Sequence, residues 1–80
     1  MDIYSSEGKK QPSVEILLNS KELGILVNAL QEFKARCEQY KSENEGEKDL
    51  GMAHVHYQDY DKDSKGKYEL VFYIDFDKEQ

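Results

Sequence analysis

The sequence predicts a small α+β domain in which one long amphipathic helix packs on one face of a three- or four-stranded, mostly antiparallel sheet, in the order (β)β-α-β-β. Three observations lead to this fold class. Apolar residues recur at helical spacing over residues 19–42, they alternate over residues 13–18, and they alternate again in two segments after residue 51. At 80 residues, the chain is expected to form a single domain, residues 1–80, with about one layer of core.

The N-terminal segment, residues 1–12, is predicted to be a polar segment or an edge strand. Ile3 and Tyr4 favour a strand, and the polar stretch SEGKKQP follows them. Residues 13–18 then place apolar side chains at every second position, which is the period of a strand. If both segments are strands, we expect them to form a hairpin around residues 7–11.

Residues 19–42 are predicted to form the helix. Asn19 as N-cap and Glu22 three residues later make a capping box. Ile25 falls on the far side of the helix, where one exposed isoleucine is ordinary. The apolar stripe expected to face the sheet consists of Leu23, Leu26, Val27, Leu30, Phe33 and Cys37.

Two strands are expected after the helix, which is followed by an acidic loop at residues 43–51. Residues 52–60 alternate in character, and residues 67–76 show the strongest alternation in the chain. The intervening DKDSKG has the composition of a turn. We therefore expect these strands to form a hairpin, while the order of strands in the whole sheet stays open.

One face of such a sheet would be left open. A helix about 10 Å wide covers only part of a sheet roughly 15 to 19 Å wide. This face is predicted to be more apolar than a solvated face usually is, which favours an interface with another protein or a second copy. Alternatively, the helix ends and the acidic loop fold over it. Its expected side chains include Leu17, His54, His56, Val71 and Tyr73.

Composition narrows the choice of partners and compartment. The net charge of −6 argues against nucleic acid and against an anionic membrane surface, since both would repel the protein. The single cysteine excludes an internal disulfide and a Cys-based zinc site. No apolar run approaches the ~20 residues of a membrane span, and MDIYSSEGKK lacks the centre of a signal peptide. We expect a cytoplasmic protein.

Two groups of residues could carry metal chemistry. His54 and His56 point the same way from a strand and could share one transition metal, but no third histidine or cysteine ligand is available. Asp59, Asp61 and Asp63 match the start of a calcium loop, although the glycine and the final glutamate of that loop are missing. The histidines are therefore interpreted as a structural or interface pair and the aspartates as a charged turn, with no metal or cofactor.

Enzyme motifs do not emerge from the sequence. Cys37 lies on the apolar stripe and is expected to be a buried thiol. The chain has no nucleophile-elbow sequence and no glycine-rich phosphate loop. We therefore expect a protein that is not an enzyme.

The order of three segments, VEILLNSKELGILVNALQEF, MAHVHYQDYD and KYELVFYIDF, resembles the bacterial immunity protein 32 family, which is found with polymorphic toxins. The similarity covers roughly residues 14–76. It implies a cytoplasmic protein that binds and neutralises a cognate toxin, which the acidic surface would suit if the toxin is basic. The hypothesis for the partner-binding site is His54, His56, Tyr73, Asp59 and Asp61.

The sequence thus predicts a protein-binding domain, with the immunity function as the leading hypothesis. One alternative is a homodimeric structural or regulatory domain that pairs through its open sheet face. Another alternative is a small metal-binding protein that uses His54 and His56.

Overall fold

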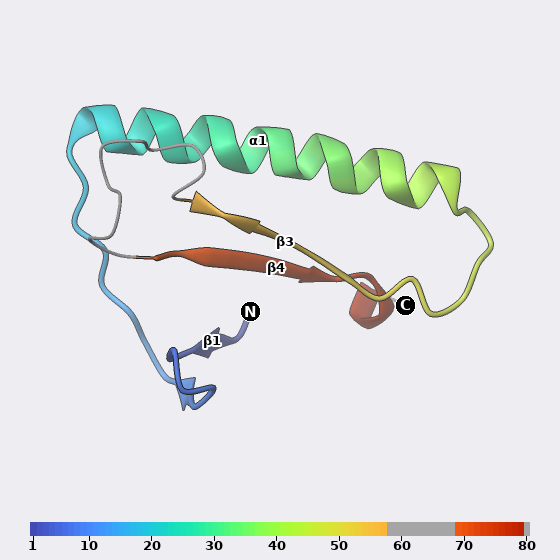
Figure 1. Ribbon diagram of the computed structural model, residues 1–80, viewed down its shortest axis with the longest axis horizontal. Coiled ribbons are helices and arrows are strands. Elements are labelled where there is room, and N and C mark those ends of the chain that lie inside the picture. The colour runs from blue at the N-terminus through green and yellow to red at the C-terminus, as the bar shows by residue number, and fades with distance from the viewer. Residues whose placement is uncertain (58–68, 80) are drawn as a thin grey trace.

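The protein is α+β, with one long helix and two separate antiparallel hairpins (Figure 1). The computed structural model describes residues 1–57 and 69–79. Within these residues the strands do not share one sheet, so the prediction of a three- or four-stranded sheet is wrong. The elements are β1 (Ile3–Tyr4), β2 (Lys10–Gln11), α1 (Ser20–Glu43), β3 (Met52–His56), β4 (Val71–Asp75) and the 3-10 helix η3 (Phe76–Glu79).

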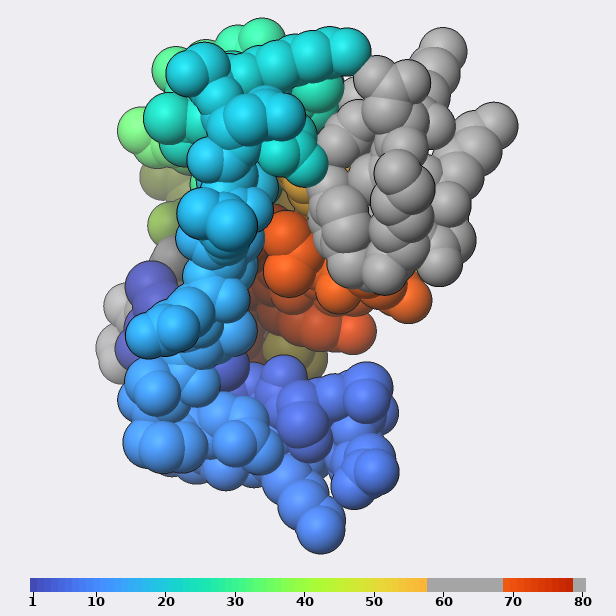
Figure 2. Space-filling model, turned by 90° about the vertical axis from the view of Figure 1, so that its left-hand side faces the viewer, coloured from blue at the N-terminus to red at the C-terminus, as the bar shows by residue number. Residues whose placement is uncertain are grey.

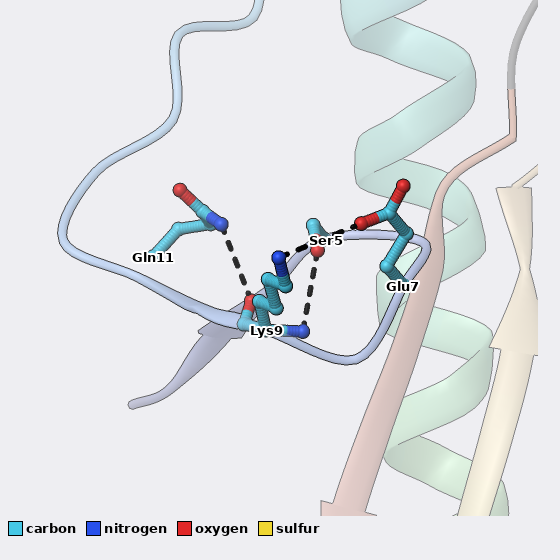
Figure 3. A network of polar contacts seen from close by, with 4 residues as sticks. All are labelled: Ser5, Glu7, Lys9 and Gln11. Carbon is cyan, nitrogen blue, oxygen red and sulfur yellow. Dashed lines mark hydrogen bonds and ion pairs between the residues drawn. The ribbon is translucent and has the colours of Figure 1, made fainter.

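The β1–β2 hairpin confirms the expected strand at Ile3 and Tyr4, but its partner is Lys10–Gln11 and not residues 13–18. The turn closes when the Ser5 amide donates to the Lys9 carbonyl at 2.8 Å. The Lys9 amide also donates to the Ser5 hydroxyl at 3.2 Å (Figure 3). Gly8 supplies the positive φ of 82° that this turn requires.

Asp2 connects this hairpin to η3. The Lys78 ammonium donates a 3.1 Å hydrogen bond to the Asp2 carboxylate, and Lys10 forms an ion pair with it at 3.2 Å. The hydrogen bond from Lys78, followed by that from Lys10, lowers the pKa of the Asp2 carboxyl. The same contact raises the pKa of Lys78. Two segments at opposite ends of the sequence are thereby joined.

Residues 13–18 do not form the predicted strand. They lead from the hairpin to α1 along the surface, in light blue in Figure 2. Val14, Ile16 and Leu17 are all exposed, and Leu17 is 98% exposed. A strand needs a neighbour that pairs with its amides and carbonyls, and no described strand lies beside this segment. Leu17 is therefore not part of the open sheet face, contrary to the prediction.

Helix α1 begins as predicted. The Glu22 amide donates to the Asn19 side chain at 2.8 Å, and the Asn19 amide donates to the Glu22 carboxylate at 3.0 Å, which completes the capping box. At the other end, the Asn44 amide and side chain both donate to the Tyr40 carbonyl. Both helix termini thus have partners for some of the backbone groups that a helix leaves unpaired.

The buried side of α1 is rotated relative to the predicted stripe. Ala29, Phe33 and Cys37 are buried, whereas Leu23 and Val27 are exposed. Ile25, expected on the far side, is partly buried, as are Leu26 and Leu30. The helix is oriented by the contacts of Phe33 and Cys37 with the β3–β4 hairpin and Phe76, so its buried side extends towards Ala29 and Ile25 and leaves Leu23 and Val27 in solvent.

The core lies between α1 and the β3–β4 hairpin. Phe33 and Cys37 of α1 form one cluster with Val55 of β3 and with Phe76, which begins η3. Tyr40 adds a ring contact to Phe76, with centroids 5.1 Å apart. The partly buried side chains that pack against this cluster are Leu50, Ala53, Phe72 and Ile74.

The final hairpin confirms the two predicted strands in shorter form. β3 ends at His56, and residues 58–60 of the predicted strand lie outside the described residues. β4 begins at Val71, whereas residues 67 and 68 also lie outside them. Antiparallel register pairs His54 with Tyr73 and leaves successive side chains on opposite faces.

Candidate protein-binding face

One face of the β3–β4 hairpin points away from α1, as predicted. Ala53 and Val55 lie on the side of the core, so the intervening residues of β3 face the other way. Residues directly opposite each other in an antiparallel pair share a face. We call this surface the open face; its side chains are Met52, His54, His56, Val71, Tyr73 and Asp75.

Three rings form a cluster on the open face. The centroids of His54 and His56 are 5.3 Å apart, and their planes meet edge to face at 78°. The His54 ring lies 5.6 Å from that of Tyr73, its cross-strand partner, at 36°. Both separations fall in the range of attractive ring contacts. The structure therefore brings together His54, His56 and Tyr73 from the predicted site.

The open face exposes large apolar side chains. Met52 is 62% exposed and Tyr73 is 63% exposed, although both are large side chains that a folded protein more often shields. Met52 was not named in the predicted site. Asp59 and Asp61, which were predicted to belong to it, lie outside the described residues.

Glu69 is a polar neighbour that sequence reasoning missed. Its carboxylate lies 2.8 Å from Nδ1 of His56, and the contact becomes an ion pair when the imidazole is protonated. Both side chains are solvent-exposed to a large extent, so the pair contributes little to stability. The sequence did place Glu69 on the same side of its strand as Tyr73, but only the hairpin register puts it beside His56.

A hollow of about 160 Å³ lies between α1 and β3. It is smaller than the roughly 300 to 1,000 Å³ of typical ligand pockets, so it suits one apolar side chain better than a whole small molecule. Among its described lining residues none belongs to β4, which places the hollow at the outer side of β3. The lining is mostly apolar and consists of Phe33, Arg36, Cys37, Tyr40, Ala53, His54 and Phe76.

The histidine pair lacks a third ligand in the part of the chain that the structure describes. Over residues 1–57 and 69–79, no three side chains of His, Cys, Asp or Glu are placed to hold a metal ion.

Across the same residues, no helix combines the length and the apolar character needed to cross a membrane.

Comparisons with protein-family models, with curated proteins and with solved structures each found no match. The similarity to immunity proteins accordingly stays a prediction that rests on the order of the sequence segments.

Proposed function

We propose that this protein is a non-enzymatic binding domain whose open face contacts another protein. The observation that carries the proposal is the ring cluster of His54, His56 and Tyr73, flanked by the exposed side chain of Met52. Aromatic residues and methionine are enriched at protein interfaces, and tyrosine is frequent among the residues that dominate binding energy. An exposed face with these side chains suits contact with another protein.

The partner that suits this domain is basic. The net charge of −6 accelerates the approach of a positively charged protein and disfavours an acidic one. Asp75 on the open face and Glu69 beside it place carboxylates next to the ring cluster. Charge at the rim of an interface chiefly affects the association rate, whereas the desolvated rings at its centre contribute to affinity.

The specific function that we propose is immunity: the domain binds and neutralises a cognate bacterial toxin with a basic surface. The order of sequence segments and the acidic charge support this form of the proposal. The product of the neighbouring gene is the natural first candidate for the toxin.

The test is to measure binding of that gene product to the unmodified protein and to Tyr73→Ala by biolayer interferometry. Loss of a central tyrosine is expected to weaken binding by at least about tenfold. Tyr4→Ala is the matched control, because Tyr4 is also an exposed tyrosine but lies on β1. Equal binding by the unmodified protein and Tyr73→Ala would exclude the open face as the contact surface.

A further inference from the structure

The outer edge of β3 has backbone groups that point away from β4. The Tyr57 amide donates a 2.8 Å hydrogen bond to the Leu70 carbonyl, so position 57 faces β4. Antiparallel pairing alternates, and therefore the amides and carbonyls of Met52, His54 and His56 face the other way. Within the described residues no strand pairs with this edge. Such an edge is a template for an added strand.

The hollow between α1 and β3 lies directly beside this edge. Its lining includes Phe33 and Cys37 from α1 and Ala53 and His54 from β3. A strand added to β3 would direct every second side chain towards α1. One such side chain would enter the hollow, which is the arrangement of peptides that bind between a strand edge and a helix.

The chain itself contains a segment with the properties of such a strand. Residues 13–18 have the alternation of a strand, yet they are unpaired among the described strands and expose Val14, Ile16 and Leu17. Figure 2 shows this segment running along the surface between the N-terminal hairpin and α1. Exposed apolar side chains on an unpaired, strand-forming segment favour pairing with another chain.

We propose that residues 13–18 of a second copy add to the outer edge of β3, with Ile16 in the hollow, and that the exchange is reciprocal. Val14 then lies on the same side as Ile16, while Glu15 and Leu17 lie on the side of the open face. Each β3–β4 sheet, which has two strands in one copy, thereby gains a third. A reciprocal exchange has the two-fold symmetry of most homodimers.

Charge complementarity supports this occupant. Glu15 is the one charged residue within residues 13–18. Glu15 would lie on the side of the open face, where the outer edge of β3 carries His54 and His56. The segment thus brings a carboxylate beside two imidazoles that can be protonated.

The segment cannot fill the hollow of its own chain. Along α1, Cys37 lies about 27 Å from Asn19 at 1.5 Å per residue. The three residues from Asn19 back to Ile16 span only about 10 Å when fully extended. Ile16 can therefore approach Cys37 only from a second copy. This inference does not depend on the immunity proposal, since the open face stays available to a partner.

Cysteine cross-linking tests the arrangement directly. In Ile16→Cys, mild oxidation is expected to form a disulfide with the native Cys37 of the second copy, giving a covalent dimer that a reductant reverses. A disulfide needs Cα atoms roughly 4.4 to 6.8 Å apart. Glu15→Cys, on the opposite side of the strand, should give much less dimer, and Ile16→Cys with Cys37→Ala should give almost none.

Two results would overturn the proposal in this experiment. One is that Ile16→Cys stays monomeric under oxidation. The other is that dimer forms equally without Cys37, because the cross-link then joins two copies of residue 16 by chance collision.

Sedimentation velocity of the uncross-linked protein provides a second test. The unmodified protein is expected to form a concentration-dependent dimer, and Ile16→Asp is expected to weaken it by at least about tenfold. Leu23→Asp is the matched control, since Leu23 is an exposed leucine on α1 outside the proposed contact. Circular dichroism checks that both variants stay folded. A monomeric unmodified protein, or an unaffected Ile16→Asp dimer, would contradict the inference.

Discussion

The hydroxyl of Tyr57 donates a 2.8 Å hydrogen bond to the backbone carbonyl of Glu22, which joins the end of β3 to the first turn of α1. Tyr57 is 1% exposed, the largest of the fully buried side chains described. Glu22 is also the residue that closes the capping box on Asn19. The start of the helix is thus held both by its own cap and by the strand that packs near it.

Tyr57→Phe is expected to lower the free energy of unfolding by about 1 kcal/mol, because the ring stays in place while the Glu22 carbonyl loses a partner. Tyr57→Ala should cost about 3 to 5 kcal/mol, since it also leaves a cavity. Urea denaturation followed by circular dichroism measures both. Tyr73→Phe, at an exposed tyrosine, serves as the control. A Tyr57→Phe variant as stable as the unmodified protein would show that this hydrogen bond does not hold the helix.

Asn19→Ala is expected to cost about 1 kcal/mol in unfolding free energy, because it removes the acceptor of the Glu22 amide. Asn28→Ala is the control at an exposed position inside α1, and it should be neutral or slightly stabilising because alanine favours a helix. Thermal or urea denaturation distinguishes them. If both variants were equally stable, the capping box would have no measurable effect.

Asp77 organises the connection that enters β3. Its carboxylate accepts hydrogen bonds from the Leu50 amide at 2.9 Å and from the Gly51 amide at 3.2 Å. In Asp77→Ala, these two amides should exchange with solvent faster by about tenfold, because opening no longer breaks bonds to a charged acceptor. Hydrogen exchange followed by NMR measures each amide. Glu45→Ala, in the same connection, should leave the exchange rates of these two amides unchanged. Unchanged rates in Asp77→Ala would show that the Asp77 carboxylate does not hold the Leu50 and Gly51 amides.

The Asp2 carboxyl is expected to titrate at a lower pKa than an ordinary aspartate, chiefly because of the hydrogen bond from Lys78. A pKa depressed in the folded state means that the pairing stabilises the fold above the unfolded-state pKa. That stabilisation is lost as the pH falls through the folded-state pKa. NMR titration of the carboxyl carbon should show the low pKa, and Lys78→Ala should raise it. Lys48→Ala is the control. If the pKa of Asp2 is the same in Lys78→Ala as in the unmodified protein, the contact between Lys78 and Asp2 is refuted.

Local signals in the sequence predicted the helix and the final hairpin well. The start of α1 was evident because Asn19 and Glu22 form a cap from neighbouring residues. The alternation around His54 and Tyr73 correctly placed both side chains on the open face. The helix cap and the strand alternation are determined by residues that are close in the sequence, so they can be predicted without knowing which distant segments are in contact.

Features that depend on pairing between distant segments could not be predicted. Residues 13–18 have the pattern of a strand, but pattern does not supply a neighbouring strand, and none is found among the described residues. The contact of Glu69 with His56 depends on a hairpin register that no turn motif specified. The rotation of α1, which exposes Leu23 and Val27, depends on how Phe33 and Cys37 pack against Val55 and Phe76, which lie far away in the sequence.

NMR mapping tests most directly whether the open face binds a protein partner. The labelled protein is titrated with the product of the neighbouring gene, and backbone amide shifts are followed. If the open face is the contact surface, the largest changes are expected to cluster at His54, His56 and Tyr73, with little change at exposed positions on β1 and β2 such as Tyr4. Changes confined to the N-terminal hairpin or to the solvent side of α1, with the open face unaffected, would contradict it.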